Sequence, residues 1–412
     1  MAYIPRLVDP LLERLLAGLP AVLVVGPRAS GKTTTARRHA ADELRLDRPA
    51  DAATARADPD LALRIRRTPL LVDEWQLVPE VLGAIKRAVD DEPRPQRFVI
   101  TGSTQADLTA AGWPATGRAV RVPMWGLSQR ELVGNPRDPS VIDRIAADGV
   151  LALGRSPDPP DLAGYVEAAL RGGFPDVALQ PDRGLRRRWL DSYVDQIVAR
   201  DGALVDGGRD PVRIRRYLQA CAVNTAGTVM HKTLYDAAEV NRLTAVGYDR
   251  LLTALLVIDP LPAWSTNRLS RLTSTPKRHL VEPALLGPLV GVDAASVLRD
   301  PDLLGRLLDS FVVAQLRPEL AASDRSPRLY HLRQQDGRHE VDLIIELADG
   351  RIIAIEVKAA SAPSRADARH LIWLREQLGD RVSAALVLHA GPHHYPLGDG
   401  VHAVPICSLW AP

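Results

Sequence analysis

The stretch GPRASGKT at residues 26–33 determines the fold expected for the amino-terminal part of the chain. It follows the apolar run Ala21–Val25 and precedes a helical segment, so the sequence predicts a strand, a glycine-rich loop and a helix. Such a loop points backbone N–H groups at a phosphate chain, and the helix adds the positive end of its dipole. The expected nucleotide-binding residues are Gly26, Pro27, Arg28, Ala29, Ser30, Gly31, Lys32, Thr33 and Thr34.

The rarity of lysine makes Lys32 informative. Only five of the 52 basic residues are lysine, and the remainder are arginine. The planar fork of arginine cannot replace a compact ammonium group between two phosphates. We therefore expect Lys32 to neutralise the β- and γ-phosphates and Thr33 to hold the Mg²⁺ that bridges them. Lys358 is the other lysine that lies in a recognisable motif.

Composition restricts the class of protein. With 412 residues, 46% of them hydrophobic and 25% charged, the chain is long enough for two or three globular domains. Two cysteines form no disulfide framework, and no apolar run approaches the roughly 18 residues of a membrane span. Residues 1–19 lack the apolar core of a signal peptide. We expect a cytoplasmic protein without a membrane partner, and the net charge of +2 leaves other partners open.

The pattern along the chain predicts three α/β or helical domains. Residues 1–155 alternate apolar runs with helical segments, which favours a parallel sheet covered by helices, and a linker rich in proline follows at 154–160. Residues 161–300 are mainly helical, with a hairpin at about 258–279, and residues 301–412 form a separate α/β unit. The strands expected in the first domain are Ala21–Val25, Leu44–Leu46, Leu70–Val72, Arg97–Ile100 and Arg118–Val122.

Two consecutive carboxylates follow a buried strand at residues 70–72. Asp73 at the strand end can hold Mg²⁺, and Glu74 can orient and deprotonate the water that attacks the γ-phosphate. A further strand runs into Thr101-Gly102-Ser103, where the Ser103 hydroxyl can contact the γ-phosphate or that water. The alternatives are the start of a helix for the acidic pair and a capped turn at Ser103. Arg118 is a candidate for stabilising transition-state charge, either in its own subunit or in a neighbour of a homo-oligomer.

A second constellation lies in the last quarter of the chain, where residues 340–347 and 352–358 read as a β-hairpin. A three-residue loop with Gly350 in the left-handed conformation pairs Leu347 with Arg351 and sets Asp342 opposite Glu356. A two-residue turn would put the two acids on opposite faces. We expect the first register, in which Asp342 and Glu356 can bind Mg²⁺ and Lys358 can position or activate a water for phosphodiester attack.

Several stretches together resemble a bacterial and archaeal AAA+-like ATPase family. They are GPRASGKTT (26–34), LLVDEWQ (70–76), FVITGSTQ (98–105), GRAVRVPMWGLSQREL (117–132), LRGGFP (170–175) and TPKRHLVEPA (275–284). That family joins a P-loop ATPase module to a C-terminal domain with a restriction-endonuclease-like fold. The resemblance implies ATP and Mg²⁺ as cofactors and ATP hydrolysis as the activity. The hairpin is similar to the D…E-x-K site of restriction-endonuclease-like enzymes, and the helix predicted at 304–316 offers Asp309 as a third metal-binding acid.

The middle segment is similar to a winged helix-turn-helix. Helices are expected at 231–239 and 244–256, and a hairpin follows from Ile258. If this domain contacts DNA, its second helix would do so through Arg242, Thr244 and Arg250. The alternative is a connector that only relays the nucleotide state. An acid-rich sheet without catalysis is likewise the alternative for the C-terminal site.

The sequence therefore predicts a cytoplasmic ATPase that acts on nucleic acid through a nuclease-fold domain. Two other classes remain. One is a nucleotide-dependent regulatory or scaffold protein whose nuclease fold is inactive. The other is a small-molecule kinase with a P-loop, which explains neither the strand that ends at Ser103 nor the last hundred or so residues.

Overall fold

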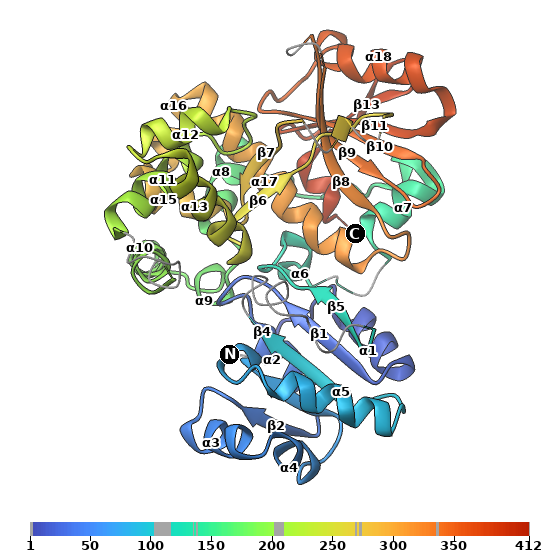
Figure 1. Cartoon of the computed structure of the whole chain (residues 1–412). Helices are drawn as coiled ribbons and strands as arrows, with labels where there is room; N and C mark the ends of the chain where they lie inside the picture. The colour runs from blue at the N-terminus through green and yellow to red at the C-terminus, as the bar shows by residue number, and fades with distance from the viewer. Residues whose placement is uncertain are drawn as a thin grey trace. The chain divides into compact units, whose positions relative to one another are not determined.

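The structure is a computed structural model of the 412-residue chain. It describes residues 3–102, 117–134, 136, 139–201, 210–267, 270–271, 274–334 and 338–411. The chain divides into two compact units, the first with Met1–Leu127 and Ala254–Leu256, the second with Ser128–Thr253 and Val257–Pro412 (Figure 1). The three domains expected from the sequence stay a prediction.

The first unit is built on a five-stranded parallel sheet in the order β2-β3-β4-β1-β5. All five predicted strands are present, and their ends lie within two residues of the predicted ones. The strands are β1 (Ala21–Val25), β2 (Asp42–Arg45), β3 (Leu70–Asp73), β4 (Phe98–Gly102) and β5 (Ala119–Pro123).

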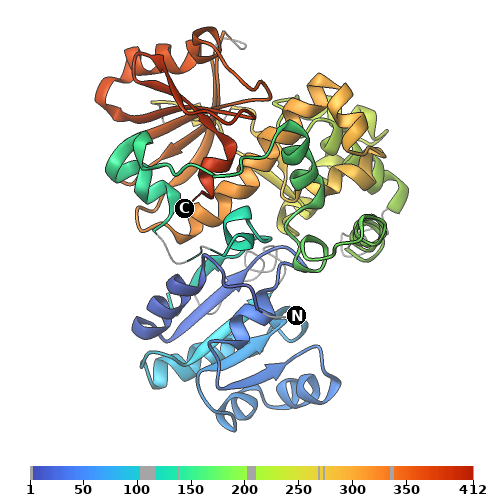
Figure 2. The same cartoon turned by 180° about the vertical axis from the view of Figure 1, so that it is seen from behind.

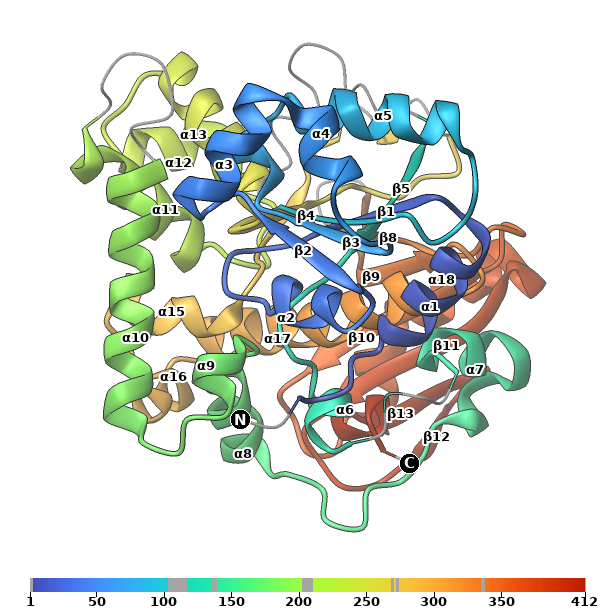
Figure 3. The ribbon, with the colours of Figure 1, turned by 90° about the horizontal axis from the view of Figure 1, so that it is seen from below.

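Helices cover both faces of this sheet because its central strands are apolar on both sides. Ala21, Leu23 and Val25 of β1 join the core beneath α3, α4 and α5, whereas Val22 and Val24 face α1 and α2. Figure 3 shows the two helical layers on opposite sides of the strands. The helices are α1 (Asp9–Gly18), α2 (Lys32–Arg37), α3 (Pro49–Ala57), α4 (Pro59–Arg64) and α5 (Val81–Asp91), with the 3-10 turn η1 (Trp75–Leu77).

The second unit begins with a mainly helical part. Residues 153–161 contain no helix or strand and lie within this unit, and the linker expected at 154–160 stays a prediction. A two-stranded antiparallel sheet, β6 (Ile258–Leu261) with β7 (Lys277–Leu280), interrupts the helices. The helices are α6 (Gln129–Leu132), α7 (Val141–Asp148), α8 (Leu162–Arg171), α9 (Pro175–Ala178), α10 (Arg183–Gln196), α11 (Pro211–Val223), α12 (His231–Ala237), α13 (Arg242–Ala254), α15 (Leu286–Val290) and α16 (Ala294–Arg299).

The C-terminal part of the second unit is a six-stranded mixed sheet in the order β12-β13-β11-β10-β9-β8. Figure 2 shows this part of the chain in orange and red. Helix α18 packs on β9, β10 and β11, and α17 packs on β10. Of these six strands, only β9 and β10 were located from the sequence. The elements are α17 (Pro301–Ala322), β8 (Arg328–Gln334), β9 (His339–Glu346), β10 (Ile352–Lys358), α18 (Arg369–Leu378), β11 (Val382–His389), β12 (Tyr395–Gly398) and β13 (Val401–Pro405).

The β9–β10 hairpin has the register predicted from a three-residue loop. Ile352 pairs with Glu346 and Ile355 with Leu343, and the Leu347 N–H donates to the Arg351 carbonyl at 2.8 Å. Gly350 has a φ of 84°, the left-handed conformation that this loop requires. Continuing the register by one residue sets Asp342 opposite Glu356.

A buried ion pair fastens α6 to α17. The Arg130 Nη1 donates to both carboxylate oxygens of Glu319 at 3.1 and 3.0 Å, and both side chains are at most 3% exposed. The Val141 N–H and the Gln129 N–H donate to Glu319 and Gln315, one helical turn apart on α17. The second half of the GLSQREL stretch therefore anchors the chain to α17.

None of the helices in the described parts of the chain has the length and apolar character of a membrane span. Both cysteines, Cys221 and Cys407, are buried and free.

We predict that Arg130→Met destabilises the protein by about 3–5 kcal/mol, because it leaves the Glu319 carboxylate buried without its charged partner. Urea unfolding followed by circular dichroism measures this free energy. The matched control is Arg183→Met, which removes an exposed pair with Glu167 and should cost less than about 1 kcal/mol. An unchanged unfolding midpoint for Arg130→Met would contradict the role assigned to this pair.

Candidate functional site

The glycine-rich loop connects β1 to α2 and begins at the carboxyl end of the central strand. Gly26 lies so close to the backbone that follows β5 that a Cβ atom there would stand 2.0 Å from the Met124 carbonyl oxygen. Arg6 fixes the other side of the loop, because its Nη1 donates to the Ser30 carbonyl at 3.0 Å and its Nη2 to the Trp125 carbonyl at 2.6 Å. The loop is therefore held from two directions.

Lys32 is buried inside this loop. Its ammonium group donates to the carbonyls of Gly26 at 3.1 Å and Pro27 at 2.8 Å. Burial lowers the pKa of Lys32 to about 8, although the Glu74 and Asp73 carboxylates oppose this shift. The cation that we expected at the β- and γ-phosphates thus lies in the loop and near both acids.

Asp73 lies at the end of β3 and accepts two hydroxyl hydrogen bonds. Thr33 Oγ1 donates to Asp73 Oδ1 at 2.8 Å, and Thr101 Oγ1 donates to the same oxygen. Because β3, β4 and β1 are parallel neighbours, their carboxyl ends bring Asp73, Thr101 and the loop to one edge of the sheet. Glu74 follows with a φ of 57°, and its carboxylate accepts a hydrogen bond from Gln76 Nε2.

These residues fit a magnesium-bound triphosphate. The Thr33 hydroxyl and the Asp73 carboxylate form an adjacent pair of hard oxygen ligands of the kind that Mg²⁺ prefers. Ser30 Oγ is buried without a hydrogen-bond partner within the described part of the protein, which is consistent with a phosphate oxygen as its partner.

The remaining nucleotide-site predictions have mixed outcomes. Ser103 lies outside the described residues, and Thr34 is exposed. Arg118 precedes β5, whose first residue pairs with Ala21, so Arg118 lies at the opposite edge of the sheet from the loop. Five strand residues place it about 16 Å away, and its Nε donates to Asp90 at 2.7 Å. The role of Arg118 in stabilising transition-state charge, in its own subunit or in a neighbouring one, stays a prediction, and this position disfavours action within its own subunit.

Sequence reasoning missed two residues of this site. Arg6 contacts the loop from 24 positions away in the sequence, and no local pattern predicts such a contact. Thr101 had a signal, since a hydroxyl at the end of the strand beside the loop strand points to the phosphate edge, but only Ser103 was considered there.

The second constellation is the acidic cluster, which we define as Asp309, Asp342 and Glu356. Lys277 of β7 lies between its first two members: the ammonium group donates to Asp342 Oδ1 at 3.0 Å and forms an ion pair with Asp309 Oδ2. Lys358 pairs with Glu356 Oε2 at 2.8 Å. The structure thus brings all the predicted residues together and adds a lysine that the sequence analysis had not assigned to them.

The pKa values follow from this crowding. Burial alone would lower the pKa of Lys277, but Asp309 and Asp342 raise it above its ordinary value. Burial would also raise the pKa of Asp342, yet Lys277 and Lys358 hold it below its ordinary value. Burial and then Asp342 raise the pKa of Glu356 well above its ordinary value. Lys277 and Asp342 therefore remain a charged pair.

A divalent metal ion does not fit this cluster as it is arranged. The ammonium group of Lys277 occupies the position between the Asp309 and Asp342 carboxylates that a metal ion would need. Within the described residues, no group of three or more His, Cys, Asp or Glu side chains is arranged to hold a metal ion.

A polar cleft of about 580 Å³ opens onto the acidic cluster. Asp302, Asp309, Glu340 and Asp342 line it together with Lys277, Arg306, Arg333 and Lys358. Acidic and basic side chains are therefore balanced, and Asp342, with 20% of its side chain exposed, is reachable from it.

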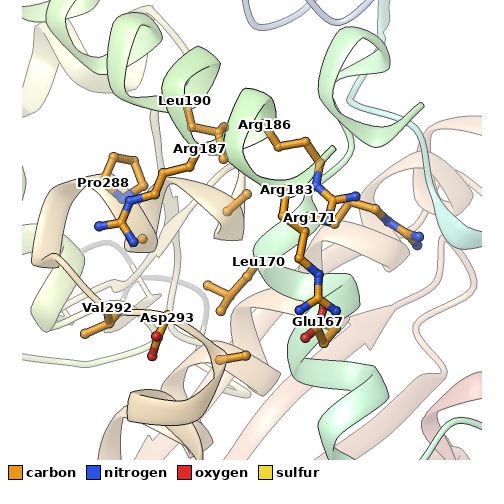
Figure 4. Close-up of a pocket in the computed structure, with 13 residues that line it drawn as sticks. Glu167, Leu170, Arg171, Arg183, Arg186, Arg187, Leu190, Pro288, Val292 and Asp293 are labelled. Atoms are coloured by element: carbon orange, nitrogen blue, oxygen red, sulfur yellow. The ribbon is translucent and has the colours of Figure 1, made fainter. Parts of the chain in front are cut away.

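A separate hollow of about 200 Å³ lies among α8, α10, α15 and α16 (Figure 4). Arginines of α8 and α10 surround an apolar floor that includes Leu170, Leu190 and Pro288. Arg183 at its rim pairs with Glu167 at 2.8 Å. Leu170, Arg171 and Ala284 of this hollow belong to the stretches at 170–175 and 275–284, but none of the predicted catalytic, nucleotide-binding or metal-binding residues lines it.

Three family models match successive parts of the chain. A model described as AAA domain matches residues 19–133, and two models described as domains of unknown function, DUF8612 and DUF4143, match residues 162–296 and 304–409. Similar proteins include uncharacterized proteins of Mycobacterium tuberculosis and Mycobacterium bovis. Each is 32% identical to this chain over 409 residues, which covers 96% of this chain and 82% of the relative.

The chain belongs to the family of these mycobacterial proteins. Its first unit carries an AAA-type P-loop ATPase domain, which confirms the prediction from residues 26–34 and 70–76. The restriction-endonuclease-like character of the C-terminal part stays a prediction, because the matching model is described as of unknown function. Among solved structures, a Walker-type ATPase of Pyrococcus abyssi is similar, with 14% identity and a TM-score of 0.40 over 68% of this chain and 94% of that one.

The buried lysine predicts a pH dependence of nucleotide affinity. Since a pKa of about 8 leaves Lys32 protonated at pH 7 and mostly neutral at pH 9, binding of a triphosphate must restore its proton at the higher pH. The affinity for MgATP should fall about tenfold from pH 7 to pH 9.

Isothermal titration calorimetry in buffers with different ionisation enthalpies measures both this affinity and the proton uptake. Lys32→Met should bind more weakly and lose the pH dependence, whereas Lys86→Met, which alters an exposed lysine paired with Asp90, should retain it. An affinity that stays constant from pH 7 to pH 9 in the unchanged protein would be inconsistent with a neutralised lysine in the loop.

Proposed function

We propose that this protein is a magnesium-dependent ATP hydrolase whose nucleotide state controls a nuclease-fold domain that acts on DNA. The observation that carries the first part is the Asp73 carboxylate, which accepts hydrogen bonds from Thr33 of the phosphate-binding loop and from Thr101 of β4. Asp73 provides an anchor for Mg²⁺, and the buried Lys32 next to it provides a cation for the phosphates.

Each residue then has one role. Lys32 neutralises the β- and γ-phosphates, while Thr33 and Asp73 hold the magnesium ion, which supplies charge neutralisation at the phosphate oxygens. Glu74 orients the attacking water and accepts its proton. Gln76 donates to the Glu74 carboxylate and so restricts its direction, and Thr101 positions Asp73.

Three variants test ATP hydrolysis. Lys32→Ala should abolish turnover, because no other described lysine lies in the loop, and Thr101→Val should lower kcat about tenfold by freeing the Asp73 carboxylate. Thr101→Ser keeps the hydroxyl and should restore most of this loss. Steady-state phosphate release at saturating Mg²⁺ measures all of them.

The matched control for Lys32→Ala is Lys86→Ala, which should leave turnover unchanged. Turnover that survives in Lys32→Ala would overturn the assignment of the catalytic site. An equal loss of turnover in Thr101→Val and Thr101→Ser would show that Thr101 is not part of the catalytic site.

The proposal that the second unit contacts DNA rests on α12, α13 and the β6–β7 hairpin, an order similar to a winged helix-turn-helix. Helix α13 buries Ala245, Tyr248 and Leu252, whereas Arg242 and Arg250 are exposed. Two cations on the outer face of such a helix are suited to phosphate contacts.

We expect Arg242→Gln combined with Arg250→Gln to weaken binding of a DNA duplex about tenfold and to reduce its salt dependence. Fluorescence anisotropy over a range of salt concentrations measures both effects. The control Arg188→Gln changes an exposed arginine of α10 and should have no effect. If the unchanged protein, the double variant and the control have equal affinities for DNA, then DNA does not contact α13 and binds either elsewhere or not at all.

One observation favours the regulatory alternative for the C-terminal part. The order α17, β8, β9, β10, α18, β11 and the pair of Asp342 with Glu356 are similar to a restriction-endonuclease-like core. The lysine between Asp309 and Asp342, however, suits a domain that binds DNA without cleaving it in this conformation.

A further inference from the structure

The position of Lys277 is fixed by rigid secondary structure. Lys277 begins β7 and pairs with Leu261 of β6. On its other side, the next residue exchanges backbone hydrogen bonds with the 226–227 segment, from the Ala226 N–H to the Arg278 carbonyl at 2.6 Å and from the Arg278 N–H to the Gly227 carbonyl at 3.1 Å. A side chain that begins on a strand held from both sides reaches the acidic cluster reproducibly.

The surroundings of Lys277 are those of a bound cation. Its side chain is 3% exposed, and it contacts carboxylate oxygens from two different elements, α17 and β9. Burial of an ammonium group is costly unless several acceptors surround it. The ammonium group of lysine is a compact point charge, and here it sits between two carboxylates. In a chain with five lysines among 52 basic residues, the residue type is informative.

The charges of the cluster also exclude a divalent ion while Lys277 is present. The three carboxyl groups, even if all are ionised, are opposed by the ammonium groups of Lys277 and Lys358 and leave a single negative charge. A divalent ion would make this buried site positive. With all three carboxyl groups ionised, as binding of a metal ion requires, removal of Lys277 would leave the cluster with two negative charges, which match one divalent ion.

Two carboxylate oxygen atoms of the acidic cluster accept no hydrogen bond from the described residues. Asp309 Oδ1 and Glu356 Oε1 are buried and have no hydrogen-bond partner among the described residues, and these side chains are 8% and 4% exposed. Buried carboxylate oxygens without donors are unusual in proteins. Both oxygen atoms are therefore available as ligands for a cation. The single ammonium group of Lys277 only partly replaces such a cation.

We propose that the acidic cluster is a latent divalent-metal site in which the ammonium group of Lys277 takes the place of the metal ion. This inference deepens the nuclease-fold part of the proposed function, and its test measures metal binding, so that ATP turnover does not enter. The domain holds no catalytic metal at this cluster as long as β7 keeps Lys277 in place. The ligands of the opened site would be hard oxygens, which suit Mg²⁺ and Mn²⁺.

Titration with Mn²⁺ followed by electron paramagnetic resonance tests the proposal in the full-length chain without nucleotide. Lys277→Met, which keeps the length of the side chain but removes its charge, should gain one Mn²⁺ site at least about tenfold tighter than any site of the unchanged protein. Adding Asp342→Asn to this variant should abolish the new site. Lys232→Met changes an exposed lysine paired with Asp236 and should gain nothing.

Two results would overturn the proposal. One is a folded Lys277→Met protein, judged by circular dichroism, that gains no Mn²⁺ site. The other result is observed without changing Lys277. If the unchanged protein binds Mn²⁺ and Asp342→Asn abolishes this binding, the cluster holds a metal ion while Lys277 is present, and the lysine does not replace a metal. Because the second comparison keeps Lys277, it remains decisive even if Lys277→Met fails to fold.

Discussion

The second unit depends on the neutralisation of two carboxylates that α17 carries into the protein interior. Asp309 and Glu319 are 6% and 2% exposed, and a buried carboxylate without a cation would be strongly destabilising. Each cation comes from a distant part of the chain, Lys277 from β7 and Arg130 from α6. These two ion pairs join helix α17 to the helical part and to the segment that follows the first unit. The charges that fix this architecture also determine which ions the acidic cluster accepts.

The first unit also buries a carboxylate, which accepts hydrogen bonds from neutral groups. Asp73 is 2% exposed, and its carboxylate accepts hydroxyl hydrogen bonds from Thr33 and Thr101. Hydroxyl donors hold the oxygen without neutralising it, so Asp73 keeps its capacity for a cation. The two acidic sites of this protein therefore differ in kind: Asp73 accepts hydrogen bonds from hydroxyl groups, with Lys32 nearby but bonded to loop carbonyls, whereas Asp309 and Asp342 pair directly with a lysine.

Local patterns in the sequence predicted the parts of the fold that local physics determines. The loop at 26–33, the buried strand before Asp73 and the register of the β9–β10 hairpin follow from glycine conformations and from the alternation of side chains. The contacts of Arg6 and Lys277 could not be predicted, because they join residues far apart in the sequence. The expected strand Arg118–Val122 already put Arg118 at the start of its strand, and the parallel pairing of β5 with β1 puts that start at the edge of the sheet opposite the loop.

The ion pairs of α17 also restrict how such proteins can be recombined. A chimera that joined residues 301–412 to a preceding part without a lysine at position 277 or an arginine at position 130 would leave Asp309 or Glu319 without its cation. Such a junction would bury an unmatched charge. Insertion or exchange of modules in this architecture therefore has to respect electrostatic partners and not only the boundaries of compact segments.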